Sequence, residues 1–338
     1  MGFALASRRR PPSLAGMLSP RSLRWWCVLG VLGSLLGAAE RPQVQALKIT
    51  VLSTMLADGD ELGEWGFAAL VEADGKKILF DTGAKTDVVQ QNLRTLKLSL
   101  TDVPDVVLSH WHWDHVGGFM TLRRDVMAKR PAALARTHVA AGFFDPRVGT
   151  PPRVELNRMI AVRPDYEATG GAFVVHEKPV QLHPGVWLTG PVPRRHPERN
   201  WSGNTRIRTA TGEREDTLPE DMALVVDTAA GLVIVTGCGH AGVVNIVEHA
   251  RATVRPARVH ALIGGVHLFR ASEETLAWTA DRLREPGVDH IIGAHCTGIE
   301  TVWRLRDLLG LDRARCVVGA VGQTFVLGKG IDARTIAK

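Results

Sequence analysis

The chain has 338 residues, of which 45% are hydrophobic and 22% charged. This is enough apolar material for a sizeable core, which excludes an intrinsically disordered chain. The net charge of +6 lies mostly in residues 1–39, which hold five arginines and no acidic residue. Because the remainder is almost neutral and lacks a basic stripe interleaved with aromatic residues, the composition gives no support for a nucleic-acid binder.

Residues 1–39 are typical of a targeting segment. The arginine-rich start leads into WWCVLGVLGSLLGAA (25–39), an apolar run that is too short to span a bilayer comfortably and ends in small residues. This pattern predicts a secretory signal peptide and a periplasmic or secreted protein. The alternative is an uncleaved N-terminal membrane anchor, in which case only this segment contacts a membrane. We expect residues 40–338 to form a single domain.

Short apolar runs bounded by glycine and charged residues predict strands in the first half of this domain. The predicted strands are LKITVLS (47–53), GFAALVEA (66–73), KKILFDTG (76–83) and VPDVVLS (103–109), with helices near 86–96 and 119–129. The last of these strands leads directly into His110. Residues 130–220 mix proline, arginine and short strands such as GAFVVHE and VWLTG, and they are the least predictable part.

The second half of the domain shows the same pattern of short apolar runs. MALVVDTAAGLVIVTG (222–237) predicts a two-stranded hairpin, and further strands are VHALIGG (259–265), DHIIGA (289–294), RCVVGA (315–320) and QTFVLG (323–328). Helices are expected near 243–252, 273–284 and 299–309. Because strands and helices alternate in both halves without a long linker, we predict two mixed β-sheets packed together with helices outside.

The stretch SHWHWDHVGG (109–118) places three histidines and one aspartate in six consecutive positions. In an extended loop, positions i and i+2 face the same way, so His110 and His112 can hold one ion while Asp114 and His115 turn toward a second. This donor set suits zinc first, with manganese or iron as alternatives. A pair of such ions lowers the pKa of a shared water from about 15.7 toward about 7.

The pattern His-x-His-x-Asp-His after a buried strand resembles the metallo-β-lactamase superfamily, and the resemblance extends over roughly residues 47–328. It implies the αββα four-layer fold of that superfamily. The segments GCGHAGVVNIV (237–247), IGGVHL (263–268), AHCTG (294–298) and LHPGVWLTGPVPR (182–194) resemble one branch more narrowly. That branch includes the dihydropterin ribofuranosylaminobenzene-phosphate synthase of methanopterin biosynthesis.

The resemblance also implies the metal ligands. It places His110, His112 and His240 on one ion, and Asp114, His115 and His295 on the other. The chain departs from the superfamily at Gly237-Cys238, where most members have a Gly-Asp pair whose aspartate bridges both ions. Three alternatives stay open for Cys238: a bridging thiolate, a thiol behind the ligands, or a gap that His240 fills. His196 is a weaker candidate than His240 for the remaining histidine ligand.

Several further residues carry open interpretations. Asp81 ends a predicted strand, and we expect it to orient a ligand histidine rather than to touch metal. His267 is either a ligand or a structural histidine. Arg194 and Arg195 could bind an anionic substrate or form a solvated surface pair, and Trp113 could be a substrate platform, although packing is the commoner role of tryptophan.

These features predict a metal-dependent hydrolase acting on a small-molecule substrate. A hydroxide held between two divalent metal ions would attack an ester, lactone or phosphoester, with Asp114 holding the second ion and accepting the proton. One alternative, from the branch resemblance, is a transferase that releases pyrophosphate from a pterin while bonding it to an aminobenzene. A predicted export signal argues against such a role because the substrates are cytoplasmic. Another alternative is a non-catalytic, metal-dependent ligand binder.

Overall fold

The central strands bury both of their faces, because successive side chains point to opposite sides of a sheet. In β13 (Gly231–Thr236), Val233 and Val235 pack into the core between two sheets, whereas Leu232 and Ile234 pack beneath the helices. This near-continuous run of apolar residues is what a strand covered on both faces requires.

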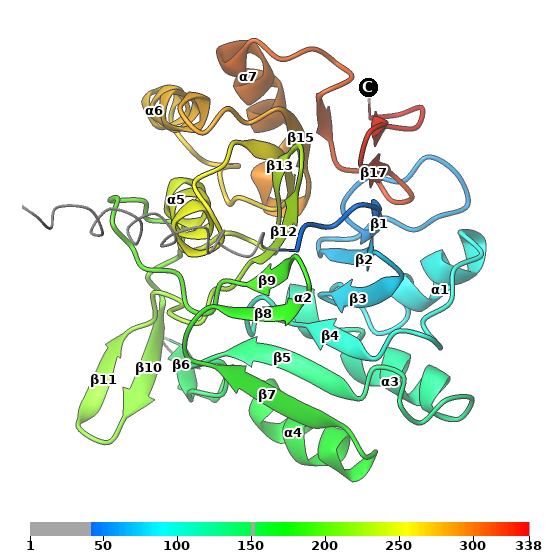
Figure 1. The fold of residues 1–338 in the computed structure, drawn as a ribbon. Helices are drawn as coiled ribbons and strands as arrows, with labels where there is room; N and C mark the ends of the chain where they lie inside the picture. The colour runs from blue at the N-terminus through cyan, green and yellow to red at the C-terminus, as the bar shows by residue number, and fades with distance from the viewer. Residues whose placement is uncertain (1–41, 150–152, 338) are drawn as a thin grey trace, which may run out of the picture. The chain divides into compact units, whose positions relative to one another are not determined.

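The computed structural model describes residues 42–149 and 153–337 (Figure 1). The described residues all belong to one compact unit. The predicted signal peptide or anchor, residues 1–39, lies outside the described residues. Within the described ranges, no helix is both long and apolar enough to cross a membrane.

The first sheet has eight strands in the order β18-β17-β1-β2-β3-β4-β5-β7. Their bounds are β1 (Leu47–Ser53), β2 (Ala68–Ala73), β3 (Lys76–Phe80), β4 (Asp105–Val107), β5 (Arg136–Ala140), β7 (Ala172–His176), β17 (Thr324–Val326) and β18 (Gly330–Asp332). Strands β3, β4, β5 and β7 run parallel, and the other pairs are antiparallel.

The second sheet has seven strands in the order β16-β15-β14-β13-β12-β9-β8. Besides β13, it contains β8 (Val180–His183), β9 (Val186–Leu188), β12 (Leu224–Thr228), β14 (Val259–Gly264), β15 (His290–Gly293) and β16 (Cys316–Val318). Strands β13 to β16 are parallel, and β8, β9, β12 and β13 pair antiparallel. A small third sheet joins β6 (Arg147–Gly149), β10 (Thr205–Thr209) and β11 (Gly212–Glu215).

Helices cover the outer face of each large sheet (Figure 1). Apolar side chains of α1 (Val88–Thr95), α3 (Phe119–Met127) and α4 (Met159–Ala168) pack on the first sheet, and those of α5 (Val243–Thr253), α6 (Glu273–Arg284) and α7 (Ile299–Leu309) pack on the second. Another apolar cluster fills the space between the sheets. This is the αββα four-layer arrangement with two mixed sheets, and the prediction of the fold is confirmed.

Local differences from the sequence expectations occur where apolar periodicity is weak. Helix α4 forms although it contains Pro164, and it buries only Met159 and Tyr166. The β10–β11 hairpin was not predicted because its strands are largely exposed and charged. A short helix, α2 (Trp113–Val116), occupies part of the stretch for which we expected an extended loop.

Candidate metal centre

The two sheets bring the carboxyl ends of five strands to one place. In the first sheet, Asp81 follows β3 and His110 follows β4 closely. In the second sheet, Cys238 follows β13, His267 follows β14 and His295 follows β15. Loops at the end of a rigid sheet are the usual position of functional residues, and parallel strands place these loops at the same edge.

The histidine-rich loop changes direction at His112. This residue has extended backbone angles and precedes α2, and the backbone N–H of His115 donates to the carbonyl of His112 at 3.0 Å. The expectation of a fully extended loop was therefore wrong beyond His112. The turn still separates His110 and His112 from Asp114 and His115, which sit in the first helical turn.

Among the described residues, the side-chain ligand atoms at this edge form two separate groups and a third, Cys238, His240 and His267, that overlaps both; within each group all such atoms lie within 4.8 Å of one another. The first ligand group is His110, His112 and His240, and the second ligand group is Asp114, His115, Cys238 and His295. The ring centroids of His110 and His115 are 4.2 Å apart, so the groups adjoin. The structure thus brings together all six residues for which the sequence predicted metal ligation.

The structure also distinguishes His240 from His196, the weaker candidate for the same ligand position. The ring of His240 lies 4.8 Å from that of His110 and 4.9 Å from that of His112. The side chain of His196 instead lies beside α5, with its Nε2 atom 2.9 Å from Glu248 Oε2. His196 belongs to neither ligand group.

Hydrogen bonds orient three of the histidines so that Nε2 faces the centre. Asp81 Oδ2 lies 2.7 Å from His115 Nδ1 and accepts a hydrogen bond from Ser109 Oγ at 2.7 Å. The Ser109 hydroxyl donates its hydrogen to Asp81. It therefore accepts a hydrogen bond from His110 Nδ1, at 2.9 Å. His240 Nδ1 donates to the carbonyl of Asn200. A histidine that donates from Nδ1 keeps a lone pair on Nε2 for a metal.

A metal ion would be coordinated by these Nε2 lone pairs. Among the described residues, the buried Nε2 atoms of His110 and His240 have no hydrogen-bond partner, and that of His295 lies 3.2 Å from Asp114 Oδ2. An unpartnered buried polar atom is costly and needs an explanation. Imidazole nitrogens and a carboxylate form a donor set that suits a divalent ion such as zinc, so the residues present fit a metal.

Burial and the neighbouring rings hold the pKa of His110 and of His240 well below the usual range, and burial lowers the pKa of His112 to about 4. These rings are therefore neutral at neutral pH, as ligation requires. Burial also lowers the pKa of His115, but the carboxylates of Asp81 and Asp114 outweigh it and raise that pKa to about 9. His115 consequently binds a metal only by giving up a proton.

Cys238 lies within the second ligand group rather than behind it. Its Sγ atom is 3.1 Å from His115 Nε2, and the residue is 2% exposed. Burial raises the pKa of the Cys238 thiol well above its usual value in the absence of metal. The neighbouring Cys296 contacts the backbone carbonyl of Cys238 through Sγ, at 3.6 Å.

The backbone around the centre is strained and tightly packed. Asp81, His267 and His295 adopt left-handed conformations, with φ of 55°, 50° and 48°. Non-glycine residues in this region cost energy and cluster at functional sites. A Cβ atom at Gly237 would collide with the Ser109 hydroxyl, so only glycine allows the loop after β13 to approach the loop after β4 this closely.

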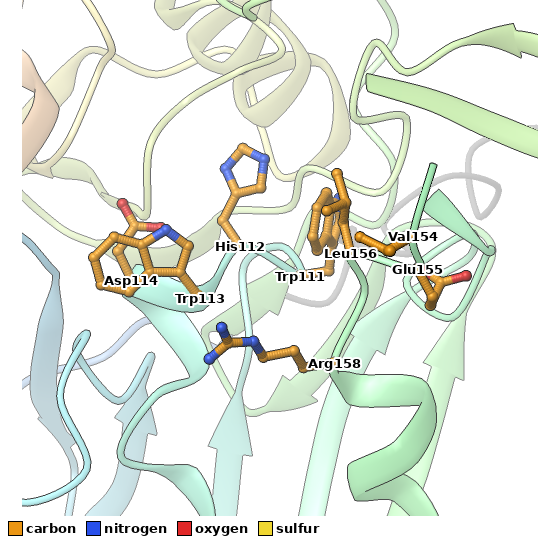
Figure 2. A pocket seen from close by; sticks show the side chains of 8 residues that line it. All are labelled: Trp111, His112, Trp113, Asp114, Val154, Glu155, Leu156 and Arg158. Carbon is orange, nitrogen blue, oxygen red and sulfur yellow. The ribbon is translucent and has the colours of Figure 1, made fainter. Parts of the chain in front are cut away.

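Two cavities flank the ligand groups. The smaller cavity, of about 460 Å³, is lined by Trp111, His112, Trp113, Asp114, Val154, Glu155, Leu156 and Arg158. Figure 2 shows Trp113 and Asp114 on one side of it and Val154, Glu155 and Leu156 on the other. The larger cavity, of about 930 Å³, is lined by residues 197–202, 267–272, 274–275 and 278–279 and by Trp65.

The structure distinguishes the predicted substrate residues. Trp113 is 52% exposed and lines the smaller cavity, which is compatible with a substrate platform. Arg194 donates to the backbone carbonyls of Thr217 and His240, and thus supports the loop that carries a ligand. Arg195 is exposed, and its backbone N–H donates to Asn245. Neither arginine lines either cavity.

Sequence reasoning missed Ser109, Asn200 and the aromatic residues of the larger cavity. Ser109 could have been suspected, because it precedes His110 at a strand end. Asn200 acts through its backbone carbonyl, so its residue type carries no signal. His267 lies between the metal centre and the larger cavity: its ring is 4.5 Å from that of His240, and it lines the cavity.

Comparison with known proteins agrees with this geometry. The sequence model of the metallo-beta-lactamase superfamily matches residues 66–200, which include the histidine-rich loop. The crystal structure of Tm1679, described as a metal-dependent hydrolase of the beta-lactamase superfamily, has a TM-score of 0.65 and 25% identity, over 82% of this chain and 98% of that one. Residues 66–200 thus match the metallo-β-lactamase superfamily, and the domain shares the fold of Tm1679. Where the resemblance to that superfamily led us to expect an aspartate, this chain has Cys238.

Two curated relatives come from Methanocaldococcus jannaschii. One is the 7,8-dihydropterin-6-methyl-4-(β-D-ribofuranosyl)-aminobenzene-5'-phosphate synthase, with 29% identity over 69% of this chain and 80% of the relative. The other is an uncharacterized protein, with 29% identity over 72% of this chain and 88% of the relative. The metallo-β-lactamase fold protein YhfI of Bacillus subtilis shares the fold, with a TM-score of 0.52 and 11% identity over 83% of this chain and 99% of that one.

Proposed function

We propose that this protein is a dinuclear metal-dependent hydrolase of an ester, lactone or phosphoester. The observation that supports the proposal is the pair of adjoining ligand groups, one with three histidines and one with a carboxylate, two histidines and a thiol. In this assignment the first group holds one divalent ion and the second group, Cys238 included, holds the other, with zinc as the first candidate metal and manganese or iron as alternatives.

When bound, such a pair of ions supplies Lewis-acid chemistry that lowers the pKa of water and polarises the oxygen of the electrophile. The side chains of the protein supply positioning and proton transfer. Asp114 is 7% exposed and lines the smaller cavity, so its carboxylate is within reach of a ligand there. Burial alone would raise the pKa of Asp114, but His115 and His295 outweigh it and hold the carboxyl ionised. An ionised Asp114 can hold a cation, and a rise of its pKa on substrate binding would be needed for it to accept a proton efficiently.

Metal analysis combined with an activity panel tests this function. Protein purified without added metal should contain about two divalent ions per chain, since there are two ligand groups. It should hydrolyse at least one member of a panel of chromogenic carboxylic esters, phosphomonoesters, phosphodiesters and lactones. A chelator should abolish this activity, and zinc, manganese or iron should restore it. Metal-loaded protein that turns over no member of the panel would remove the hydrolase assignment.

A matched pair of variants tests the ligand assignment within the same experiment. His240→Ala removes a residue whose Nε2 atom is buried and unpartnered, and it should lower both the metal content and the activity. His196→Ala removes a histidine that binds Glu248 on the surface, and it should leave both unchanged. The reverse result would assign the remaining histidine ligand to His196.

A second candidate function is a transferase that forms a pterin–aminobenzene bond with release of pyrophosphate. The similarity to the synthase of M. jannaschii favours it. Incubation of the metal-loaded protein with a dihydropterin diphosphate and an aminobenzene co-substrate tests it directly. Pyrophosphate release that depends on the aminobenzene would support the transferase, and hydrolysis without coupling would support the hydrolase.

A further inference from the structure

The larger cavity adjoins the metal centre through residues that contact the ligands, although no member of either ligand group lines it. Three of its lining residues contact ligands: His267 lies 4.5 Å from the His240 ring, and Trp65 lies 4.8 Å from the His295 ring, measured between centroids. The third, Asn200, accepts a hydrogen bond from His240 through its carbonyl. A molecule in this cavity therefore has one end beside the first ligand group.

The walls of the larger cavity expose aromatic rings that soluble proteins normally bury. Trp65 is 41% exposed and Phe269 is 37% exposed. Their ring centroids are 5.6 Å apart in an edge-to-face arrangement, and Trp278 lines the same cavity from α6. Because these residues come from three separate segments, their convergence next to a candidate metal centre needs an explanation.

One aromatic residue of the cavity is already covered. The guanidinium groups of Arg194 and Arg199 lie 5.2 and 5.5 Å from the ring centroid of Trp201. Its indole N–H also donates to Glu215, at 2.9 Å. Arg270 lies over Phe269 in the same way, whereas the exposed ring of Trp65 has no arginine over it among the described residues.

We propose that the larger cavity binds a planar aromatic or heteroaromatic group of the substrate, against Trp65 and Phe269, so that the hydrolysable bond attached to it reaches the ligand groups. This assignment rests on the proposed hydrolase function and names its substrate class. The volume of about 930 Å³ lies within the range of about 300–1,000 Å³ typical of small-molecule sites. Exposed indole and phenyl rings favour offset or edge-to-face contacts with another ring.

Two charged side chains that line this cavity, Arg270 and Glu274, form no ion pair with any described residue. Glu198 is engaged, because it accepts hydrogen bonds from the backbone of Val244 and Asn245 at 3.2 and 2.9 Å. Arg270 lies over the Phe269 ring, 5.1 Å from its centroid, and forms no ion pair with any described residue. An acidic substituent on the aromatic group would therefore find a partner in Arg270.

Binding of non-hydrolysable probes tests the proposal separately from turnover. We would titrate the zinc-loaded full chain with 2-naphthylmethylphosphonate, cyclohexylmethylphosphonate and propylphosphonate by calorimetry. These probes share a headgroup whose C–P bond is not an ester. The naphthyl probe should bind more tightly than either alkyl probe, by roughly threefold to tenfold over the cyclohexyl probe, because aromatic pairing adds to apolar burial.

Variants locate the binding surface. Trp65→Ala and Phe269→Ala should each weaken naphthyl binding by roughly threefold to tenfold, and leave propylphosphonate binding unchanged. Trp303→Ala is the control, because Trp303 is 54% exposed on α7 and lines neither cavity. Thermal unfolding verifies that all three variants are folded.

The two proposals fail in different ways. Equal affinity for the three probes, or an equal effect of Trp303→Ala, would overturn the aromatic subsite even if ester hydrolysis is found. Selective, Trp65-dependent binding without turnover of any ester would support the subsite and overturn the hydrolase assignment.

Discussion

Asp81 connects both ligand groups through one carboxylate. It accepts hydrogen bonds from the Ser109 backbone N–H at 2.8 Å and from the Ser109 hydroxyl at 2.7 Å, and it lies 2.7 Å from His115 Nδ1. The Ser109 hydroxyl in turn binds His110. One buried side chain thus orients a histidine of the first group and a histidine of the second.

Replacement of Asp81 by asparagine should therefore weaken metal binding. Asp81→Asn keeps the shape but loses the charged acceptor for His115, and removal of such a supporting group typically costs roughly 10- to 100-fold in metal affinity. Competition with a chromogenic chelator measures this change. Asp87→Asn, the same exchange at an exposed position, should leave the affinity unchanged, and an equal loss in both variants would contradict the role of Asp81.

Cys238 should be visible as a metal ligand by spectroscopy. In cobalt-substituted protein, a coordinating thiolate gives a charge-transfer band in the near ultraviolet that nitrogen and oxygen ligands do not give. We expect this band in the parent protein and in Cys296→Ser, and its loss in Cys238→Ser, because only Cys238 belongs to the second ligand group. A band that survives in Cys238→Ser but not in Cys296→Ser would exchange the two assignments.

At the scale of elements, a second buried carboxylate ties the sheets together away from the metal centre. Asp105, in β4 of the first sheet, lies 3.1 Å from Nε2 of His138 in β5 and 3.1 Å from Nε2 of His183 in β8 of the second sheet. Arg136 binds the same carboxylate from the neighbouring strand. This cluster joins the first sheet to an edge strand of the second.

The free energy of unfolding should depend on Asp105 in a pH-dependent way. Burial raises the pKa of its carboxyl, but His138 and Arg136 outweigh burial and hold it well below the ordinary 3.8. A depressed native pKa means that the contribution is present above about pH 4 and is lost as the pH falls further. Asp105→Asn should therefore lower the unfolding free energy by roughly 3 kcal/mol at pH 7.

Urea unfolding at several pH values measures this effect. The difference between parent and Asp105→Asn should shrink progressively below about pH 4, where the unfolded chain takes up a proton on this carboxyl and the native protein does not, and it should vanish only near the depressed native pKa. Asp102→Asn is the control, because Asp102 is an exposed residue that pairs with Lys77 on the surface, at 2.7 Å, and exposed pairs contribute little. A difference between parent and Asp105→Asn that is constant with pH would show that ionisation is not the cause.

At the scale of the whole molecule, each ligand group draws on both sheets. His110, His112, Asp114 and His115 follow a strand of the first sheet, whereas Cys238, His240 and His295 follow strands of the second. A bound ion would consequently link the two halves of the core. A ligand that binds only the native state stabilises it by RT ln(1 + [L]/Kd).

Removal of metal should therefore lower the thermal midpoint of the entire domain. At free metal of about 100 times Kd, the expected stabilisation is about 2.7 kcal/mol. Calorimetric scans with and without chelator measure the shift. His110→Ala/Asp114→Ala, which impairs both groups, should lose most of the chelator effect, and an unchanged effect in that variant would place the stabilising metal elsewhere.

The sequence predicted those features that local residue patterns encode. Buried strands appear as apolar runs, and His110 to His115 stand out because polar residues cluster directly after one of them. Other features depend on packing between distant segments: Asn200 acts through a carbonyl, and Trp65 meets Phe269 only in the folded chain. The β10–β11 hairpin escaped prediction because it has almost no buried side chains.

The loops of the larger cavity differ in one respect from the strand ends that carry the metal ligands. In residues 197–202, Asn200 supports the ligand loop twice: its carbonyl accepts from His240, and its side-chain Nδ2 donates to the carbonyls of Gly239 and Val266, at 3.4 and 3.5 Å. Glu198 and Asn200 must therefore be kept, whereas the exposed residues Pro197, Arg199 and Ser202 line the larger cavity and are the positions to randomise for new ligands while both ligand groups stay intact. Laboratory evolution of ligand selectivity would thus change a few exposed loop positions and leave the candidate metal centre unchanged.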